Sequence, residues 1–181
     1  NDDSLVVKGN QLIEARYKLS LGEQRLILLL ASTIQKNDKE FNTYDIRVLD
    51  FAEMFGLKTD KSLYEKVEKI SEELLGKKLY LKNTNDEFKA TVWLSYVAYK
   101  RGSGVITLRF DESLKPYLLQ IQESFTQYKL NQVMSFKSAY SIRLYELLKK
   151  EAFKAKNKRF ERCFTIEEYR NYLGIEKEKY P

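Results

Sequence analysis

Two regions of this chain match each other when the sequence is shifted by 118 residues, and this repeat constrains the fold more than any other feature. The paired positions include Ser20 and Ser138, Arg25 and Arg143, Leu26 and Leu144, Phe51 and Tyr169, and Gly56 and Gly174. Leucine matches between helices arise easily by chance, so coincidence stays open as the alternative. Because one offset serves both regions without a gap, we favour a duplicated unit.

The first copy opens with a helix. Ser20 and Glu23 have the spacing of a capping box, in which the serine accepts from a backbone N–H and the glutamate reaches back. The helix is expected to run to about Ile34, and it is apolar nearly all round from Leu26 to Ala31. Such a helix is expected to be buried on several sides, with a leucine zipper as the alternative.

A helix-turn-helix follows. Thr43–Val48 alternates as a short strand does. We expect Asp50, with Glu53 three residues on, to cap a brief helix that ends at Gly56. A second capping box, Ser62 with Glu65, is expected to open a helix whose apolar residues recur at helical spacing as far as Leu75.

Three strands come next. They are expected at 79–82, over one long segment from Phe88 to about Tyr99, and at 106–110, with a turn at Arg101–Gly104. The long strand is expected to place Phe88, Ala90, Val92, Leu94, Tyr96 and Ala98 on one face. Helix, strand, helix-turn-helix and antiparallel hairpins in this order predict an α+β fold, a winged helix.

The rest of the chain repeats the opening of that unit. We expect a helix over 111–122 with a kink or a break at Pro116, an apolar connector over 125–136, and a helix from Ser138 to about Phe153. A basic loop, a strand at 160–165 and a short helix at 167–173 should follow. Pro181 maps onto Leu63, so we expect a first winged-helix domain at 1–130 and the start of a second at 131–181, cut before its recognition helix.

Composition excludes several kinds of chemistry. The chain has no histidine and one cysteine, Cys163, so it cannot assemble a histidine-based nucleophile, a histidine-ligated metal site or a thiolate zinc site. Asp50 and Glu53 could be paired carboxylates, but their spacing is that of a helix cap. We expect no catalytic residues, no metal and no cofactor.

The sequence also indicates the cellular location of the protein. No apolar run approaches the roughly 20 residues needed to span a bilayer, and Asn1–Ser4 does not resemble a signal peptide. A single cysteine fits a reducing compartment. We therefore expect a cytoplasmic protein without a membrane partner.

Positive charge is concentrated in the second half. Residues 1–90 carry 15 Lys and Arg against 16 Asp and Glu, whereas residues 91–181 carry 17 against 10. A basic segment indicates a polyanionic partner, most commonly nucleic acid, with a solvated lysine-rich surface as the alternative. The predicted DNA contacts are Lys58, Lys61, Lys66, Lys69, Lys100, Arg101, Lys154, Lys156, Lys158 and Arg159.

Those ten residues differ in how well they suit DNA. The helix that carries Lys66 and Lys69 also carries four glutamates, which is a poor match to phosphates, so Lys58, Lys61 and the turn with Arg101 are better candidates. The arginine of such a turn can reach a minor groove. The loop from Lys154 to Arg159 makes the second copy the expected stronger binder.

Self-association is expected through the first winged helix. The strands at 79–82 and 88–99 leave a sheet edge whose N–H and C=O groups need partners. The helix that is apolar on every side from Leu26 to Ala31 adds apolar surface that needs to be buried. The predicted dimer contacts are Leu79, Leu81, Val92 and Leu94. The alternative is that the connector at 125–136 and the incomplete second domain together cover these features within one chain.

Four segments resemble a known family, the replication initiators of iteron-containing plasmids. They are LVVKGNQL at 5–12, KLSLGEQR at 18–25, SAYSIRLYELLK at 138–149 and YRNYLGI at 169–175. The resemblance covers nearly the whole chain, and RLYELL is its most specific block.

The resemblance implies a fold of two winged helices and a protein that is not an enzyme. It implies binding of direct repeats, called iterons, in double-stranded origin DNA, and recruitment of a host replication initiator and the replicative helicase. It also implies a homodimer that represses its own gene at an operator.

Other classes of function stay open. A winged-helix transcriptional regulator without a replication role is the first alternative, and a single inverted repeat beside the gene would favour it over a cluster of direct repeats. A purely structural interaction module comes next, and an enzyme is the most distant possibility.

Overall fold

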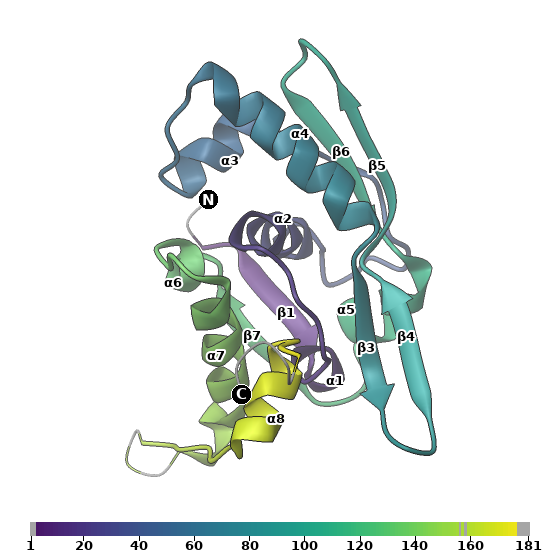
Figure 1. Cartoon of the computed structure of the whole chain (residues 1–181), viewed down its shortest axis with the longest axis vertical. Helices are drawn as coiled ribbons and strands as arrows, with labels where there is room; N and C mark the ends of the chain where they lie inside the picture. Colours follow the sequence, from purple (N-terminus) through teal and green to yellow (C-terminus); the bar gives the residue numbers. More distant parts are fainter. Residues whose placement is uncertain (1–2, 156, 158, 177–181) are drawn as a thin grey trace.

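The computed structural model describes residues 3–155, 157 and 159–176 (Figure 1). The helices and strands in chain order are β1 (Leu5–Gly9), α1 (Asn10–Ile13), α2 (Leu21–Ser32), β2 (Tyr44–Arg47), α3 (Val48–Met54), α4 (Lys61–Leu75), β3 (Lys78–Asn83), β4 (Phe88–Val92), β5 (Leu94–Lys100), β6 (Val105–Phe110), the 3₁₀ helix η1 (Glu112–Leu114), α5 (Lys115–Leu118), β7 (Phe125–Lys129), α6 (Asn131–Met134), α7 (Ala139–Lys149), the 3₁₀ helix η2 (Lys150–Lys154) and α8 (Ile166–Tyr172).

The central helix is α2, the segment that the sequence makes apolar on every side. Its capping box is confirmed: the Glu23 N–H donates to Ser20 Oγ at 3.2 Å, and the Ser20 N–H donates to Glu23 Oε2 at 2.7 Å. Leu26, Leu28 and Leu30 are fully buried although they point in different directions around the helix. The helix is therefore packed inside one chain and does not form a zipper seam (Figure 1).

Three small antiparallel sheets surround this helix. The strand orders are β1-β7, β2-β6-β5 and β3-β4. The β5–β6 hairpin forms the wing, and the α4 helix lies alongside it (Figure 1). With α2, β2, α3 and α4 preceding the hairpins, the predicted α+β winged helix is confirmed.

The expected long strand is wrong in one respect. The chain leaves β4 at Val92 and begins β5 at Leu94, and each strand pairs with a different partner. Between them Trp93 is fully buried, and a register shift follows between Leu94 and Tyr96. The side chains therefore do not share one face, since Leu94 is buried while Tyr96 is exposed.

Two helix starts also differ from prediction. The α4 helix is capped by Asp60, whose carboxylate accepts from the N–H groups of Ser62 and Leu63, so Ser62 is not the cap. The α3 helix begins at Val48, which leaves Asp50 inside the first turn. There Asp50 accepts from the Arg47 guanidinium at 2.6 and 2.7 Å, and this hydrogen-bonded pair holds the pKa of its carboxyl below the usual range.

Three segments of the second half, at 111–122, 125–136 and 160–165, differ from the predicted secondary structure. The region 111–122 forms only η1 and α5, because Pro116 is accepted at the start of a short helix that ends at Leu118. The expected connector over 125–136 is instead the strand β7 followed by α6. Residues 160–165 form no strand, although a strand was predicted there.

The internal repeat is visible in the backbone. The Leu57 N–H donates to the Ala52 carbonyl at 2.8 Å, and at the same offset the Ile175 N–H donates to the Arg170 carbonyl at 2.9 Å. Gly56 and Gly174 both adopt positive φ, at 60° and 63°. The helices α3 and α8 also begin and end at equivalent positions. Equal hydrogen bonds at equal offsets support the duplicated unit.

Candidate nucleic-acid interface

The α4 helix and the wing form one continuous surface. Leu63, Val67 and Leu74 point into the core, which turns the opposite face of α4 toward solvent. That face carries Lys61, Glu65, Lys66, Lys69, Glu72 and Glu73. The wing approaches the same helix, because a methyl group placed on Gly104 would lie 3.1 Å from the Tyr64 ring.

Four of the predicted DNA contacts have no ion-pair partner in the part of the chain that the structure describes. Lys58, Lys61 and Lys66 stand at or near the start of α4, and Lys100 stands at the end of β5. All four side chains are exposed. Free ammonium groups on one surface can bind backbone phosphates by charge alone, without reading bases.

Two other predicted contacts are held by glutamates of α4. Arg101 in the wing turn donates through Nε to Glu68 Oε1 at 3.2 Å, and Lys69 lies 3.8 Å from Glu73. The Arg101 side chain is nevertheless 87% exposed. Exposed pairs of this kind are worth little, about 0 to 1 kcal/mol, so a phosphate could replace Glu68 as the partner of Arg101.

The remaining predicted contacts lie elsewhere. Lys154 is exposed but is paired with Glu151 at 2.5 Å, and Arg159 is exposed. Lys156 and Lys158 lie outside the described residues. In Figure 1 the helices α7 and α8, between which Lys154 and Arg159 stand in the sequence, lie at the end of the molecule away from α4. The structure therefore brings the α4 and wing residues together, and among the described residues Lys154 and Arg159 do not belong to that surface.

Several basic residues of the second half are neutralised inside the molecule. Lys150 Nζ lies 3.0 Å from Glu14 Oε1, and Arg162 Nη2 lies 2.6 Å from the same atom. Both also contact the buried Glu151, at 3.3 and 3.6 Å. The charge excess that the sequence places in this half is thus partly used to attach it to the first half.

A second, deeper group of charges lies between β1, β7 and α7. We call Lys8, Arg143, Glu146, Tyr17 and Tyr128 the buried ionic cluster. Lys8 Nζ and the Tyr128 hydroxyl each donate to Glu146 Oε1 at 2.6 Å, and Arg143 Nη1 lies 3.5 Å from Glu146 Oε2. Lys8, Arg143 and Glu146 are 3% exposed or less.

The charges of the cluster shift one another's pKa. Burial alone would raise the pKa of Glu146, but Lys8 and Arg143 together outweigh burial and hold it below the ordinary value. For Lys8 burial is the larger effect, and it lowers the pKa although Glu146 opposes it. Burial also raises the pKa of both tyrosines. The cluster is a structural junction, since its groups bond to one another and Arg143 also donates to the backbone carbonyls of Ile13, Ala15 and Tyr172, while Arg143 Nε is buried without a partner.

The predicted dimer residues fall into two groups. Leu79 and Leu94 are buried in the core of this chain, with 0% and 1% exposure, whereas Leu81 and Val92 are partly exposed. Beside them Phe88 on β4 is 72% exposed. Pairing through this hairpin would therefore use Leu81, Val92 and Phe88, and the dimer itself stays a prediction.

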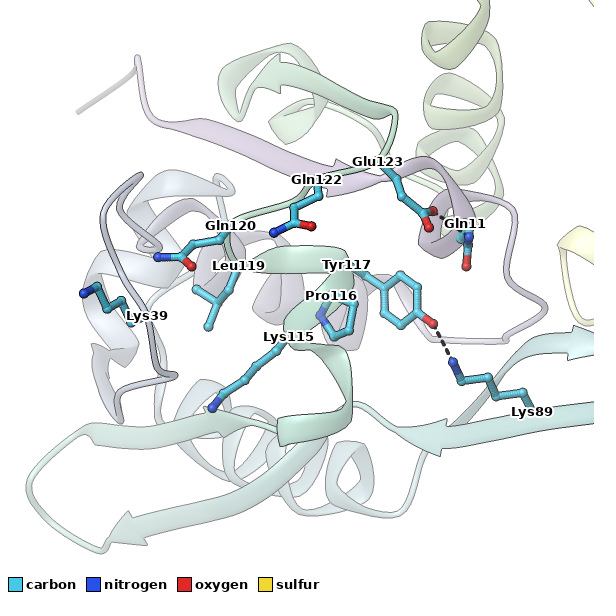
Figure 2. A pocket seen from close by; sticks show the side chains of 10 residues that line it. All are labelled: Gln11, Lys39, Lys89, Lys115, Pro116, Tyr117, Leu119, Gln120, Gln122 and Glu123. Carbon is cyan, nitrogen blue, oxygen red and sulfur yellow. Dashed lines mark hydrogen bonds between the residues drawn. The ribbon is translucent and has the colours of Figure 1, made fainter.

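One hollow was not expected from the sequence. Its residues come from α1, the loop before β2, β4, α5 and the loop before β7 (Figure 2). No local pattern joins segments so far apart in sequence, so only the folded chain reveals it. In the described part of the chain no cluster of acidic, cysteine or histidine side chains could hold a metal ion, and no helix is long and apolar enough to cross a membrane.

Comparisons with known proteins agree with this fold. The family described as initiator replication protein, WH1, matches residues 5–149. A replication initiation protein of Escherichia coli is 29% identical over 177 residues, which cover 95% of this chain and 55% of that protein. An uncharacterised 27.6 kDa protein of Escherichia coli is 25% identical over 155 residues, 79% of this chain and 65% of that protein.

A solved structure shares the architecture as well. The crystal structure of the Pi initiator protein in complex with iteron DNA superposes with a TM-score of 0.72 at 20% identity, covering 96% of this chain and 73% of that one. This chain spans between half and two thirds of the length of the two curated relatives.

Proposed function

The chain belongs to the initiator replication protein family, whose WH1 domain it contains, and from this premise we propose that it acts in the initiation of plasmid DNA replication by binding double-stranded DNA. The observation that carries the proposal is the surface formed by α4 and the wing. It gathers Lys58, Lys61, Lys66 and Lys100, exposed and without ion pairs in the described residues, next to the exposed Arg101, whose partner Glu68 is 30% exposed.

The chemistry of that surface sets the mode of binding. The lysines near the start of α4 offer their ammonium groups to phosphates, whereas the N-terminus of the helix is itself already capped by the Asp60 carboxylate. The glutamates further along α4 disfavour deep insertion into a groove lined by phosphates. We therefore infer that this domain positions the protein on DNA mainly through backbone contacts.

The finer parts of the proposal concern sites and partners. The Pi initiator, which shares this fold, is seen bound to iteron DNA, and this supports iterons at a plasmid origin as the target. We further propose a homodimer that represses its own gene at an operator. Recruitment of a host replication initiator and the replicative helicase, and a cytoplasmic location on plasmid DNA, complete the proposal.

The experiment is a selection of duplexes from a random pool, followed by a search for the selected site beside the gene. We expect the site to recur there as direct repeats. A single inverted repeat would instead identify a transcriptional regulator without a replication role.

Charge reversal tests the surface itself. Lys61→Glu and Lys66→Glu should each weaken duplex binding, and the slope of log affinity against log salt should fall by about one for each lost phosphate contact. Lys18→Glu is the matched control, because Lys18 is exposed and distant in sequence from α4. Equal losses for all three variants would contradict the assignment of DNA binding to this surface.

A further inference from the structure

The wing turn is held in one backbone conformation by its own hydrogen bonds. The Ser103 hydroxyl and the Ser103 N–H both donate to the Lys100 carbonyl, at 2.6 and 3.0 Å. The Val48 N–H at the start of α3 donates to the Gly104 carbonyl at 2.9 Å, which attaches the turn to the body of the domain. The backbone that carries Arg101 is therefore fixed before any DNA arrives, and only the Arg101 side chain still has rotamers to lose.

Glu68 of α4 is the residue that holds this side chain. Its carboxylate accepts from Arg101 Nε at 3.2 Å, and the Glu68 side chain is 30% exposed against 87% for Arg101. The same face of α4 carries Tyr64, one helical turn earlier, whose ring lies close to the wing turn. By contrast Glu65 and Glu72, about one turn before and after Glu68, are exposed and make no ion pair within the described residues.

The contact with Glu68 leaves the end of the guanidinium free. A guanidinium has five N–H donors, of which Nε carries one and the two terminal nitrogens carry four. Glu68 is bonded to Nε, and Nη1 and Nη2 of Arg101 make no hydrogen bond within the described residues. These two nitrogens form the fork that binds a phosphate through two parallel hydrogen bonds. Glu68 therefore orients the guanidinium without occupying its binding end.

The same geometry weighs against a simple exchange of Glu68 for a phosphate. A phosphate that took over Nε would approach the carboxylate that it displaces, and the two anions repel each other. A phosphate at the terminal nitrogens meets unused N–H groups and leaves the contact between Glu68 and Arg101 in place. Holding a flexible side chain in its bound conformation increases affinity, because the entropy of ordering it has already been lost.

We propose that Glu68 is a positioning residue for DNA binding, which holds Arg101 so that its Nη1 and Nη2 fork binds one backbone phosphate of the duplex. The inference rests on the proposed function, since it assigns a role within the surface formed by α4 and the wing. Lysine does not fill the place of Arg101, because a single ammonium group cannot bond to Glu68 and also present a fork.

The test is a double-mutant cycle on the intact chain, with affinity for a labelled duplex of mixed sequence measured by fluorescence anisotropy. Glu68→Ala should weaken binding by about threefold, because Arg101 must then be ordered on the DNA. In a chain that already carries Arg101→Ala, Glu68→Ala should instead strengthen binding, by up to about twofold, because it removes a negative charge beside the phosphates. A substitution that merely disturbs the fold would weaken binding in both backgrounds.

Three further variants separate charge from position. Glu68→Gln keeps an oxygen that accepts from Nε and should bind within about twofold of the native chain. Arg101→Lys keeps the charge but loses the fork, and it should weaken binding by about threefold or more. Glu87→Ala is the matched control, because Glu87 also pairs with an exposed cation, Lys82, but belongs to the hairpin of β3 and β4, whose turn lies at the opposite end of the molecule from the wing turn (Figure 1). It should not weaken binding in either background.

The Nε–H resonance of Arg101 in NMR reports the positioning without DNA. It should show restricted motion in the native chain and in Glu68→Gln, and free rotation in Glu68→Ala. A mobile Nε–H in the native chain would overturn the proposal.

The binding data have two further outcomes that count against it. Tighter binding by Glu68→Ala in the native background would show that Glu68 competes with phosphate for Arg101. Equal effects of Glu68→Ala in the two backgrounds, in a chain that binds DNA, would overturn this role of Glu68 alone. A native chain that binds no duplex would overturn the proposed function and this role together.

Discussion

At the residue scale, the least expected feature is a lysine sealed inside the molecule. Lysine is rarely fully buried, so its residue type alone predicts that Lys8 lies on the exposed face of its strand. The alternation of β1 does contain the signal, because Val6 and Lys8 are two positions apart and share the inward face. What the sequence cannot show is the partner, since Glu146 is 138 positions away.

Replacing Glu146 by glutamine should strongly destabilise the fold. The change leaves Lys8 and Arg143 buried without a carboxylate, and breaking a buried pair in this way typically costs about 3 to 5 kcal/mol. The free energy of unfolding, measured in urea at pH 7, gives the size of the loss. Glu161→Gln is the control, because Glu161 is exposed and makes no ion pair within the described residues.

The same carboxylate should contribute to acid sensitivity. The folded-state pKa of Glu146 lies below its ordinary value of 4.5, so its stabilisation is complete above that value and is lost as the pH falls through the folded pKa. The stability difference between the native protein and Glu146→Gln should therefore shrink in strong acid. A difference that stays constant from pH 7 down to pH 2 would show that Glu146 is not ionised in the fold.

At the element scale, helices whose ends are set by local sequence could be predicted, whereas changes of strand pairing could not. Helices with a capping serine and helical spacing, such as α2 and α7, are set by local sequence and were predicted well. The break between β4 and β5 could not be predicted, because alternation continues through Trp93 while the pairing partner changes. The two copies also begin their short helices differently. Arg47 and Asp50 form an ion pair at the start of α3, whereas Thr165 and Glu168, at the equivalent positions, form a capping box at the start of α8.

The two glycines that end α3 and α8 should respond differently to alanine. Both have positive φ, which costs an L-residue about 1 kcal/mol or more. At Gly56 nothing lies within 4 Å of an added methyl group, whereas at Gly174 it would lie 2.9 Å from the Tyr17 backbone. Gly174→Ala should therefore lose about 1 to 3 kcal/mol more than Gly56→Ala in urea unfolding. Equal losses would mean that α8 is not held against Tyr17.

At the scale of the whole molecule, hydrogen bonds and ion pairs join residues on the two sides of the predicted boundary between 1–130 and 131–181. Arg143 in α7 donates to the carbonyls of Ile13 and Ala15, both at 2.9 Å, and Arg162 reaches Glu14. The basic residues near the start of α4 and in the wing turn were proposed from local sequence, and their contacts with DNA stay a prediction. The hollow shown in Figure 2 and the buried ionic cluster needed the folded chain, because each joins residues more than 100 positions apart.

Self-association should depend on the β3–β4 hairpin. Phe88→Ser removes the most exposed aromatic side chain of that hairpin, and because the side chain is 72% exposed the fold should tolerate the change. If the hairpin pairs two copies, sedimentation at rising concentration should show a dimer for the native chain and a weaker one for this variant. Phe153→Ser, at a residue 78% exposed outside the hairpin, is the matched control. A native chain that remains monomeric would contradict the predicted dimer.

The pairing of β1 with β7 has a consequence for the order of folding during synthesis. Leu5 lies opposite Lys129, so β1 has no partner strand until more than 120 further residues have been made. Closing so long a loop is entropically costly and is slow compared with local helix formation. Until then Lys8 remains hydrated, and Val6 has no strand to cover it. The part of the winged helix around α2 can therefore assemble while β1 is still undocked, and β1 completes the fold only when β7 has been made.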